Sequence, residues 1–137
     1  GLLTVLVDGD DPNEPVADTL RGLLDGHLFL QRELAQAGHF PAVDVLGSLS
    51  RLMNGLVTPE QKKSADFVRQ CLAAWREGRD LIEIGAYKPG ANPRLDVAVA
   101  RMGGIEAFLR QGMGEVSNYA ETKELMQLLA RGAESKP

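Results

Sequence analysis

The chain has 137 residues, of which 44% are hydrophobic and 25% are charged, a composition typical of folded proteins and not of disordered ones. This length is enough for one ordinary domain or two small ones, with a core that needs no covalent cross-link. Cys71 is the only cysteine, which excludes the disulfide-rich secreted class. The net charge of −4, from 15 basic and 19 acidic residues, excludes a general attraction to nucleic acid or to an anionic membrane.

No apolar run approaches the roughly 20 residues that a membrane-spanning helix needs. The opening run also lacks the cationic leader and the cleavage site of a signal peptide. We therefore expect a cytoplasmic protein. Because the chain begins without Met and with a strand-like segment, we also expect it to be a fragment of a longer polypeptide.

Short strands and helices alternate in the first part of the chain, which predicts an α/β core. Pro15 starts a helix that Asp25-Gly26 stops, and Pro41 disfavours the α conformation at the residue before it. The predicted elements are a buried strand at 2–7, a helix from Pro15, a strand or helical turn at 27–30, a helix at 32–37 closed by Gly38, and an extended segment at 40–46.

The pattern becomes helical from Thr58 onward. Thr58 and Gln61 form a capping box, and the long helix behind it carries Gly78, which costs about 1 kcal/mol or bends the helix. Further predicted elements are a loop at 85–93, a helix from Asn92-Pro93 that Gly103-Gly104 interrupts, a short helix at 105–111, and a last helix from the Asn118 cap to Gly132.

The charge also changes along the chain. Residues 1–56 carry eight acidic and three basic side chains, a net of −5, whereas residues 57–137 carry eleven acidic and twelve basic ones, a net of +1. We place a domain boundary near Leu56, between an α/β part and an all-helical part.

The residues by themselves indicate little catalytic chemistry. His27 and His39 lack the spacing of a metal site, so we expect no metal and two structural histidines. Cys71 falls on the apolar stripe of the long helix, where burial disfavours the thiolate, and is expected in the core. Neither a G-x-x-x-x-G-K-[ST] loop nor a G-x-G-x-x-G loop is present, so the chain has no phosphate cradle.

Two features admit a functional interpretation beside an ordinary one. The acidic cluster Asp8, Asp10, Asp11 and Glu14 is either a solvated loop or a surface for a partner rich in Lys and Arg. Arg51, one of three basic residues in the first 56, is either in a surface salt bridge or presented to a phosphate on a neighbouring subunit.

Two long stretches resemble the rotary-type P-loop ATPases, the group that contains the ATP synthase β subunit. They are LVDGDDPNEPVADTLRGLLDGH and GAYKPGANPRLDVAVA, and they are most similar to the flagellar protein export ATPases, with the virulence type III secretion ATPases as near neighbours. The resemblance implies an α/β plus α fold: the C-terminal part of a RecA-like ATPase core at 1–56, followed by a small all-helical C-terminal domain at 57–137.

The resemblance also implies roles for single residues. Arg51, closing GSLSR, stands at the position of an arginine finger that reaches the nucleotide of the adjacent protomer. Phe40, before PAVDV, and Phe108, in AFLRQ, stand where aromatic residues contact adenine, although core packing would explain both. Met113 stands where the synthase β subunit has another aromatic residue.

Further implications concern partners and the missing half of the site. The acidic cluster would line a central pore, and Lys88 and Arg94 would lie on the loop that touches a central stalk. The implied partners are the other subunits of a homohexamer, a coiled-coil stalk protein, a stator-like regulator, the export gate at the inner membrane and export chaperone–cargo complexes, with no nucleic acid. The residues that bind most of ATP and Mg²⁺ lie upstream of Gly1 in this family, so we expect the chain alone to be inactive.

Three alternatives stay open from the sequence. The protein could belong to virulence secretion in place of flagellar export. The helical region 58–132 could chiefly be a docking module for the stalk or for chaperone–cargo complexes. A subunit of a proton-driven ATP synthase is disfavoured by the sequence of the loop at 85–94 and by Met113.

Overall fold

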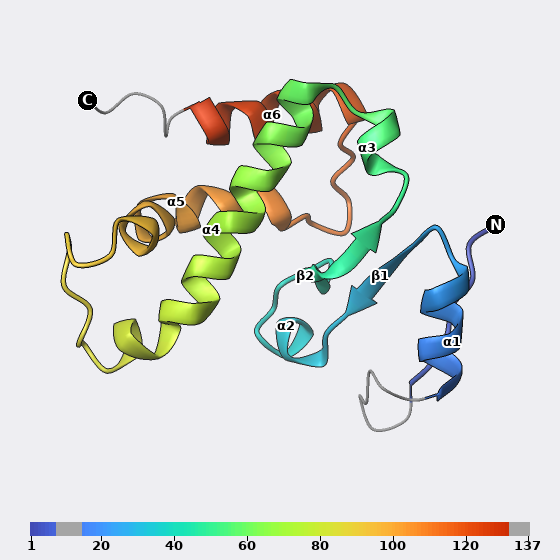
Figure 1. The fold of residues 1–137 in the computed structure, drawn as a ribbon, viewed down its shortest axis with the longest axis horizontal. Coiled ribbons are helices and arrows are strands. Elements are labelled where there is room, and N and C mark those ends of the chain that lie inside the picture. Colours follow the sequence, from blue (N-terminus) through green and yellow to red (C-terminus); the bar gives the residue numbers. More distant parts are fainter. Residues whose placement is uncertain (8–14, 132–137) are drawn as a thin grey trace.

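The computed structural model describes residues 1–7 and 15–131 (Figure 1). The fold is α/β plus α, as the sequence predicts: among the described residues, a hairpin with three short helices is followed by three long helices. In chain order the elements are α1 (Pro15–Leu23), β1 (Gly26–Leu30), α2 (Arg32–Gln36), β2 (Val43–Ser50), α3 (Met53–Leu56), α4 (Pro59–Glu83), α5 (Pro93–Leu109) and α6 (Tyr119–Arg131).

The strand predicted at residues 2–7 is wrong. These residues have no regular secondary structure, and Leu2, Leu3 and Leu6 are exposed. A strand needs a neighbour to satisfy its main-chain donors and acceptors. In the described part of the chain the two strands, β1 and β2, pair with each other, so the apolar run has no partner.

Strands β1 and β2 form an antiparallel pair with an irregular register. Gly26 pairs with Ser50 and His27 with Leu49, but Phe29 pairs with Asp44. One residue of β1 therefore faces residues 45–48 of β2, which form a wide bulge. The predicted extended segment at 40–46 is displaced, because the strand begins at Val43 and continues through this bulge to Ser50.

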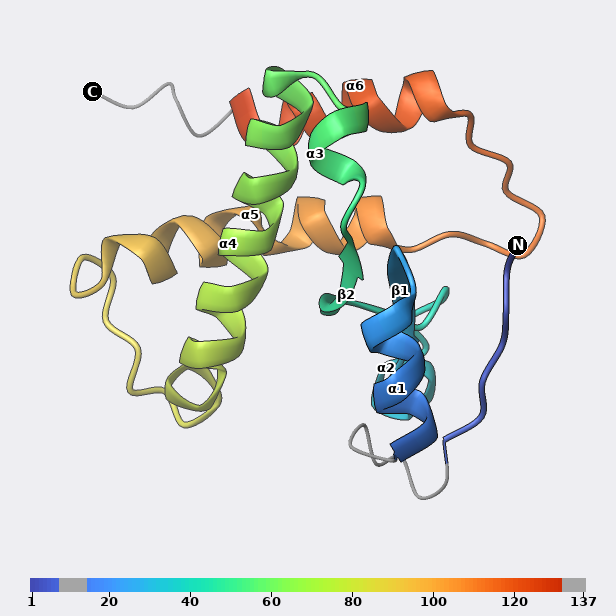
Figure 2. The same ribbon diagram turned by 45° about the vertical axis from the view of Figure 1, so that its right-hand side comes forward.

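The long helices form one apolar core around α4. Figure 2 shows α5 and α6 one above the other, with α4 crossing both. The most deeply buried side chains come from the facing sides of α4 and α5, and partly buried residues of α6 complete the cluster: Val68, Cys71, Ala74, Ala98 and Ile105, with Met126 and Leu129 against them. Burial raises the pKa of the Cys71 thiol, as expected for a core residue.

The helix boundaries confirm the predicted caps. The Thr58 hydroxyl accepts from the Gln61 amide while the Gln61 side chain accepts from the Thr58 amide, which completes the capping box. Asn92 accepts from the amides of Arg94 and Leu95 at the start of α5, and Asn118 accepts from the amide of Glu121 at the start of α6.

The interruption predicted at Gly103-Gly104 is wrong, because α5 continues through both glycines to Leu109. Met102 and Ile105, on either side of the pair, are buried in the contact with α4. Tertiary packing therefore outweighs the cost of about 1 kcal/mol that each glycine adds to an isolated helix.

Gly78 has a packing reason for its place in α4. A Cβ atom there would lie 2.5 Å from Cδ1 and 2.6 Å from Cδ2 of Leu95, a residue of α5 that is itself buried. The absence of a side chain thus lets α5 approach α4 closely.

We expect Gly78→Ala to lower the free energy of unfolding by about 1 kcal/mol, because overpacking at Leu95 exceeds the gain in helix propensity. The matched control is Gly103→Ala, where a Cβ atom meets nothing within 4 Å; this variant should be stabilised by about 0.5–1 kcal/mol. Urea unfolding followed by circular dichroism measures both. Equal stabilisation by the two substitutions would contradict the close approach of Leu95.

Candidate functional site

Arg51 lies immediately after β2 and is exposed. Its main-chain amide donates to the Asp25 carbonyl at 2.8 Å, which continues the hairpin by one residue. Its Nε donates to the Leu24 carbonyl at 3.3 Å and its Nη2 to the Arg21 carbonyl at 3.4 Å. These carbonyls lie at the C-terminal end of α1, where helical partners are missing and a positive charge is favoured. The guanidinium is thus held by its own chain while remaining open to a partner.

The strand that leads to Arg51 is organised by a buried carboxylate. Asp44 is 5% exposed, and its Oδ1 accepts from the Leu46 amide at 3.0 Å. Its Oδ2 accepts from Nε2 of Gln31 at 2.8 Å, which ties β2 to the residue before α2. Helix α4 contributes Arg76, whose Nη2 lies 2.8 Å from Oδ1 of Asp44. The carboxylate therefore joins three segments of the chain.

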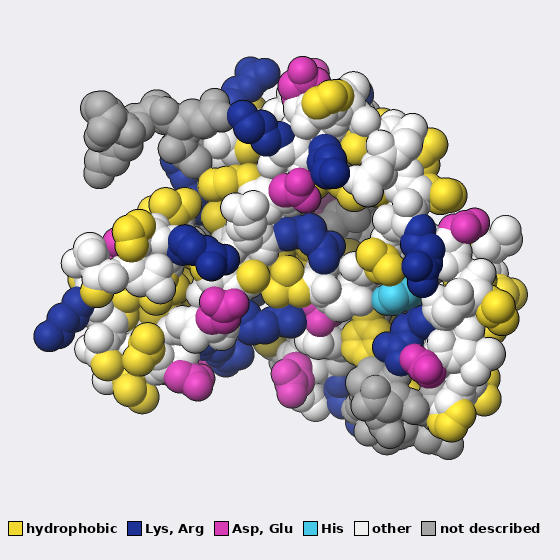
Figure 3. Space-filling model, in the orientation of Figure 1, with side chains coloured by type: hydrophobic (Ala, Val, Ile, Leu, Met, Phe, Trp, Pro, Cys, Tyr) yellow, Lys and Arg dark blue, Asp and Glu magenta, His cyan; other side chains and the backbone are white. Residues whose placement is uncertain are grey.

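Helix α4 makes a second contact with β2. Nη1 of Arg69 donates to the Val45 carbonyl at 3.0 Å and to the Ser48 carbonyl at 3.5 Å. Figure 3 shows basic side chains spread along α4 and over its junction with the hairpin. The helix thus supplies two cations to one strand.

Phe40 lies in the loop between α2 and β2, with 55% of its surface exposed. Its carbonyl accepts from the Gln111 amide at 2.8 Å, and Nε of Arg110 donates to Nδ1 of the neighbouring His39 at 3.5 Å. The loop is therefore tied to the end of α5. An exposed flat ring held by its main chain suits stacking on a ligand, whereas a ring used only for core packing would be buried.

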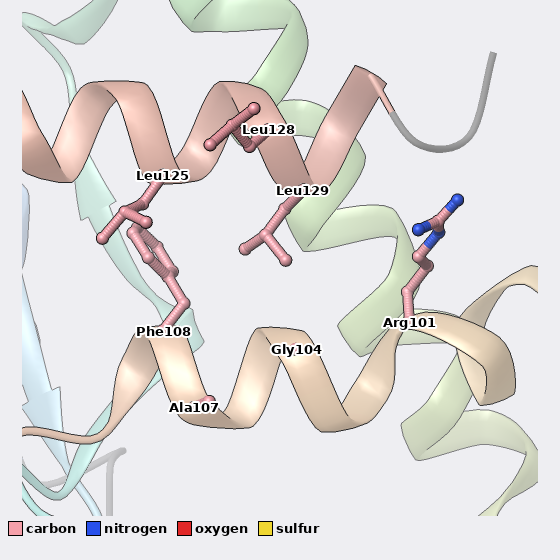
Figure 4. Close-up of a pocket in the computed structure, with 7 residues that line it drawn as sticks. All are labelled: Arg101, Gly104, Ala107, Phe108, Leu125, Leu128 and Leu129. Carbon is pink, nitrogen blue, oxygen red and sulfur yellow. The ribbon is translucent and has the colours of Figure 1, made fainter. Parts of the chain in front are cut away.

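Phe108 is half-buried between α5 and α6. Figure 4 shows its ring directed toward Leu125, within an open groove of about 380 Å³ that both helices line. Met113 is fully exposed in the segment that follows α5. The Gln111–Phe40 hydrogen bond ties the loop of Phe40 to the segment between Phe108 and Met113. The ring of Phe108, however, is directed toward Leu125 of α6.

The predicted partner-binding residues fall in two places. Asp8, Asp10, Asp11 and Glu14 lie outside the described residues. Lys88 and Arg94 are both exposed, on the loop between α4 and α5 and at the start of α5.

This loop is held by Asp96 of α5. Its Oδ1 accepts from the Tyr87 hydroxyl at 2.6 Å and its Oδ2 from the Gly90 amide at 2.9 Å. The loop that presents Lys88 is consequently fastened at its centre to the helix that presents Arg94.

The two histidines have structural partners. Nε2 of His27 lies 3.0 Å from the Gly47 carbonyl, inside the bulge of β2, and His39 accepts from Arg110. Among the residues that the structure describes, no group of three His, Cys, Asp or Glu side chains is placed to hold a metal ion. None of the helices in that part of the chain has the length and apolarity needed to cross a bilayer.

Two family profiles match the chain. The ATP synthase alpha/beta family, nucleotide-binding domain, matches residues 1–50, and the T3SS EscN ATPase C-terminal domain matches residues 57–128, more than half of the chain. The chain belongs to the type III secretion ATPase family.

Curated relatives and solved structures of this family are similar over nearly the whole chain. The flagellum-specific ATP synthase of Pseudomonas aeruginosa is 45% identical over 94% of the chain, and the type 3 secretion system ATPase of Sinorhizobium fredii is 48% identical over 92%. The assembled ATPase EscN of enteropathogenic E. coli superposes with a TM-score of 0.88, at 36% identity over 92% of the chain. EscN in complex with its central stalk EscO gives 0.80, also at 36% identity, over 85% of the chain.

The chain spans only part of each of these proteins: 29% and 28% of the two curated relatives, and 31% and 29% of the two EscN chains. The fold described here therefore corresponds to the C-terminal part of a secretion ATPase core together with its helical domain.

In this secretion ATPase chain, the residues that hold the site, namely Asp44, Arg69 and Arg76, are not among those predicted from the sequence. Asp44 could have been detected because it is an acidic residue within the apolar run PAVDV. An acidic side chain in such a run is expected to be buried only if it has a partner. Arg69 and Arg76 are seven residues apart, so two helical turns place them on the same side of α4. Their common target on β2 is visible only in the fold.

The Tyr87–Asp96 hydrogen bond raises the pKa of the Tyr87 hydroxyl, with burial and the Asp96 charge as smaller causes. A raised pKa in the folded state means that this bond stabilises the fold fully below the unfolded-state pKa and is lost as pH rises through the folded-state pKa. In a Tyr119→Phe background Tyr87 is the only tyrosine, so alkaline ultraviolet absorbance reports its titration alone.

We expect Asp96→Ala to lower the midpoint of that titration, and Asp66→Ala, on α4, to leave it unchanged. A midpoint that does not move in Asp96→Ala would show that the loop is held in another way.

Proposed function

We propose that this chain is the C-terminal part of an ATPase that energises flagellar type III protein export, and that Arg51 is its arginine finger. The supporting observation is the placement of Arg51, an exposed guanidinium at the end of β2 whose main chain is bonded to the hairpin and whose side chain rests on the end of α1. In a homohexamer, such a group faces the nucleotide of the adjacent protomer and stabilises the charge that develops on the γ-phosphoryl group.

The proposal includes a division of the chain into two functional parts. Residues 1–56 belong to the RecA-like core and carry the finger, and residues 57–137 form the helical domain. The separate apolar core of α4, α5 and α6, and the distinct family profiles that match the two parts, support this boundary.

Phe40 is the main adenine contact in this proposal, because its ring is exposed while its carbonyl is held by Gln111. Phe108 and Met113 complete that wall of the pocket from the end of α5. Mg²⁺, when bound, neutralises the phosphate charge, and its ligands and the P-loop belong to the remainder of the full-length protein. The chain's own contribution is one wall of the base pocket and the finger.

The proposed partners rest on the family resemblance. EscN assembles and binds a central stalk, EscO. For the present protein we propose a homohexamer whose acidic segment (Asp8, Asp10, Asp11 and Glu14) lines the pore and whose Lys88 and Arg94 contact a coiled-coil stalk. A stator-like regulator, the export gate and chaperone–cargo complexes complete the assembly, at the cytoplasmic face of the inner membrane.

Two other functions keep a specific observation in their favour. Virulence secretion is supported by the identity of 48% with the Sinorhizobium fredii ATPase. A docking role for the helical domain is supported by the groove between α5 and α6, where Leu125 and Leu128 are more than half exposed. The docking role is compatible with the motor, since an export ATPase also binds its cargo.

We expect the full-length protein to show ATP turnover per subunit that rises with protein concentration, and Arg51→Ala to lower kcat by about 10³-fold or more without preventing assembly. Arg79→Ala is the matched control. Arg79 is an exposed arginine of α4, and its Nε pairs with Oε1 of Glu83 in the same helix at 2.6 Å. Steady-state turnover and light scattering on the same samples measure activity and assembly.

Mixed oligomers test whether Arg51 acts in trans. Arg51→Ala subunits are mixed with subunits that lack the P-loop lysine, and each variant alone should be inactive. Mixing should restore part of the activity, because some interfaces then join an intact P-loop to an intact finger. Normal turnover by Arg51→Ala, or no recovery on mixing, would contradict the proposed finger.

The chain alone, residues 1–137, should show no ATP turnover at any concentration, because it contains no phosphate cradle. Phosphate release measured beside the full-length protein checks this. Turnover that survives further purification of the chain would contradict the assignment of the phosphate site to the rest of the protein.

A further inference from the structure

The bulge of β2 leaves main-chain acceptors that β1 does not satisfy. Residues 45–48 lie opposite a single residue of β1 and have no paired partner there, so their main-chain groups fall outside the regular ladder. Side chains take the place of strand partners: Arg69 donates to the carbonyls of Val45 and Ser48, and His27 to that of Gly47. The shape of the bulge is therefore maintained by side chains, of which Arg69 belongs to α4.

The beginning of the bulge is held in the same way. Asp44 is the last residue before the bulge that pairs with β1, and its buried carboxylate accepts from the Leu46 amide within the bulge. The Ser48 hydroxyl donates to the Asp44 carbonyl at 2.6 Å and accepts from the Phe29 amide at 2.9 Å, which closes the bulge from inside. Arg76, from outside, pairs with the Asp44 carboxylate at 2.8 Å.

Arg69 thus contacts the first and last residues of the bulge, and Arg76, from the same helix, pairs with the carboxylate of Asp44 immediately before it. The same helix is packed through Val68, Cys71 and Ala74 against the core of the helical region. Any displacement of α4 relative to the hairpin must change these contacts, and Arg51 lies only three residues beyond Ser48. A bulge next to a functional residue typically sets the direction in which that residue emerges.

We propose that Arg69 and Arg76 are positioning residues for Arg51, through which the helical domain controls the alignment of the finger. This inference rests on the proposed function of Arg51 and adds a connection between the two parts of the chain. Alignment matters because a misplacement of about 1 Å in a catalytic group can cost on the order of 10²-fold in rate. ATP binding does not depend on it, so the connection acts on kcat and not on the affinity for ATP.

The test uses the full-length protein and compares Arg76→Ala, Arg76→Lys and the control Arg79→Ala. Arg76→Ala should lower kcat on the order of 10-fold and change KM for ATP by less than about twofold, the signature of an interaction that matters in the transition state. Arg76→Lys keeps a cation within reach of Asp44 and should recover most of the loss. Arg79→Ala, whose ion pair stays within α4, should match the wild type. Light scattering confirms equal assembly.

A second readout separates positioning from general damage to the fold. The affinity for ADP with fluoroaluminate, an analogue of the transition state, is measured beside the affinity for ADP alone. Arg76→Ala should weaken binding of the analogue by about the same factor as kcat, and leave ADP binding unchanged. In an Arg51→Ala background, Arg76→Ala should cause no further loss, because the finger through which it acts is absent.

The outcomes distinguish the two proposals. If Arg51→Ala keeps normal activity, the proposed function fails and this inference fails with it. If Arg51→Ala abolishes activity but Arg76→Ala has normal kcat, or weakens analogue binding equally in the Arg51→Ala background, the positioning role alone is wrong. If Arg76→Ala does not assemble, the same measurements are made on Asp44→Asn, which keeps the shape of the side chain and removes its charge. A normal kcat in Asp44→Asn would then show that the positioning role is wrong.

Discussion

The buried carboxylate of Asp44 is the contact on which the arrangement of the first part of the chain depends. It accepts hydrogen bonds from Gln31, from the Leu46 amide and from Arg76, so it joins the segment before α2, the bulge of β2 and helix α4. A charge removed from water is tolerated only when such donors surround it. Without the carboxylate, the partly buried Gln31 side chain and Leu46 amide would lose their acceptor, whereas the exposed Arg76 would be rehydrated.

Helix α4 links the two parts of the molecule because its opposite sides have different chemistry. One side is apolar and packs on α5 and α6 through Val68, Cys71 and Ala74. Another side is cationic and reaches β2 through Arg69 and Arg76. The close approach of α5 at Gly78 adds to the rigidity of the first contact. A helix that is packed on one side and bonded on the other to the strand before Arg51 is suited to transmit displacement.

The candidate site consists of exposed side chains whose main chain is held in place. Arg51 and Phe40 are exposed, yet the main chain of each is bonded to a neighbouring element. In the proposed role, this combination would lower the entropy that must be lost when the two side chains engage a nucleotide on an adjacent subunit.

Local signals in the sequence determined the helix starts, since the caps at Thr58, Asn92 and Asn118 depend on residues within three positions of one another. The family resemblance likewise depended on contiguous motifs and was confirmed over nearly the whole chain. Tertiary structure decided the rest. The strand predicted at 2–7 has no neighbour among the described residues, and α5 continues through Gly103-Gly104 because the residues around them are buried. The junction of Asp44 with Arg76 joins residues 32 positions apart, and no local pattern encodes that distance.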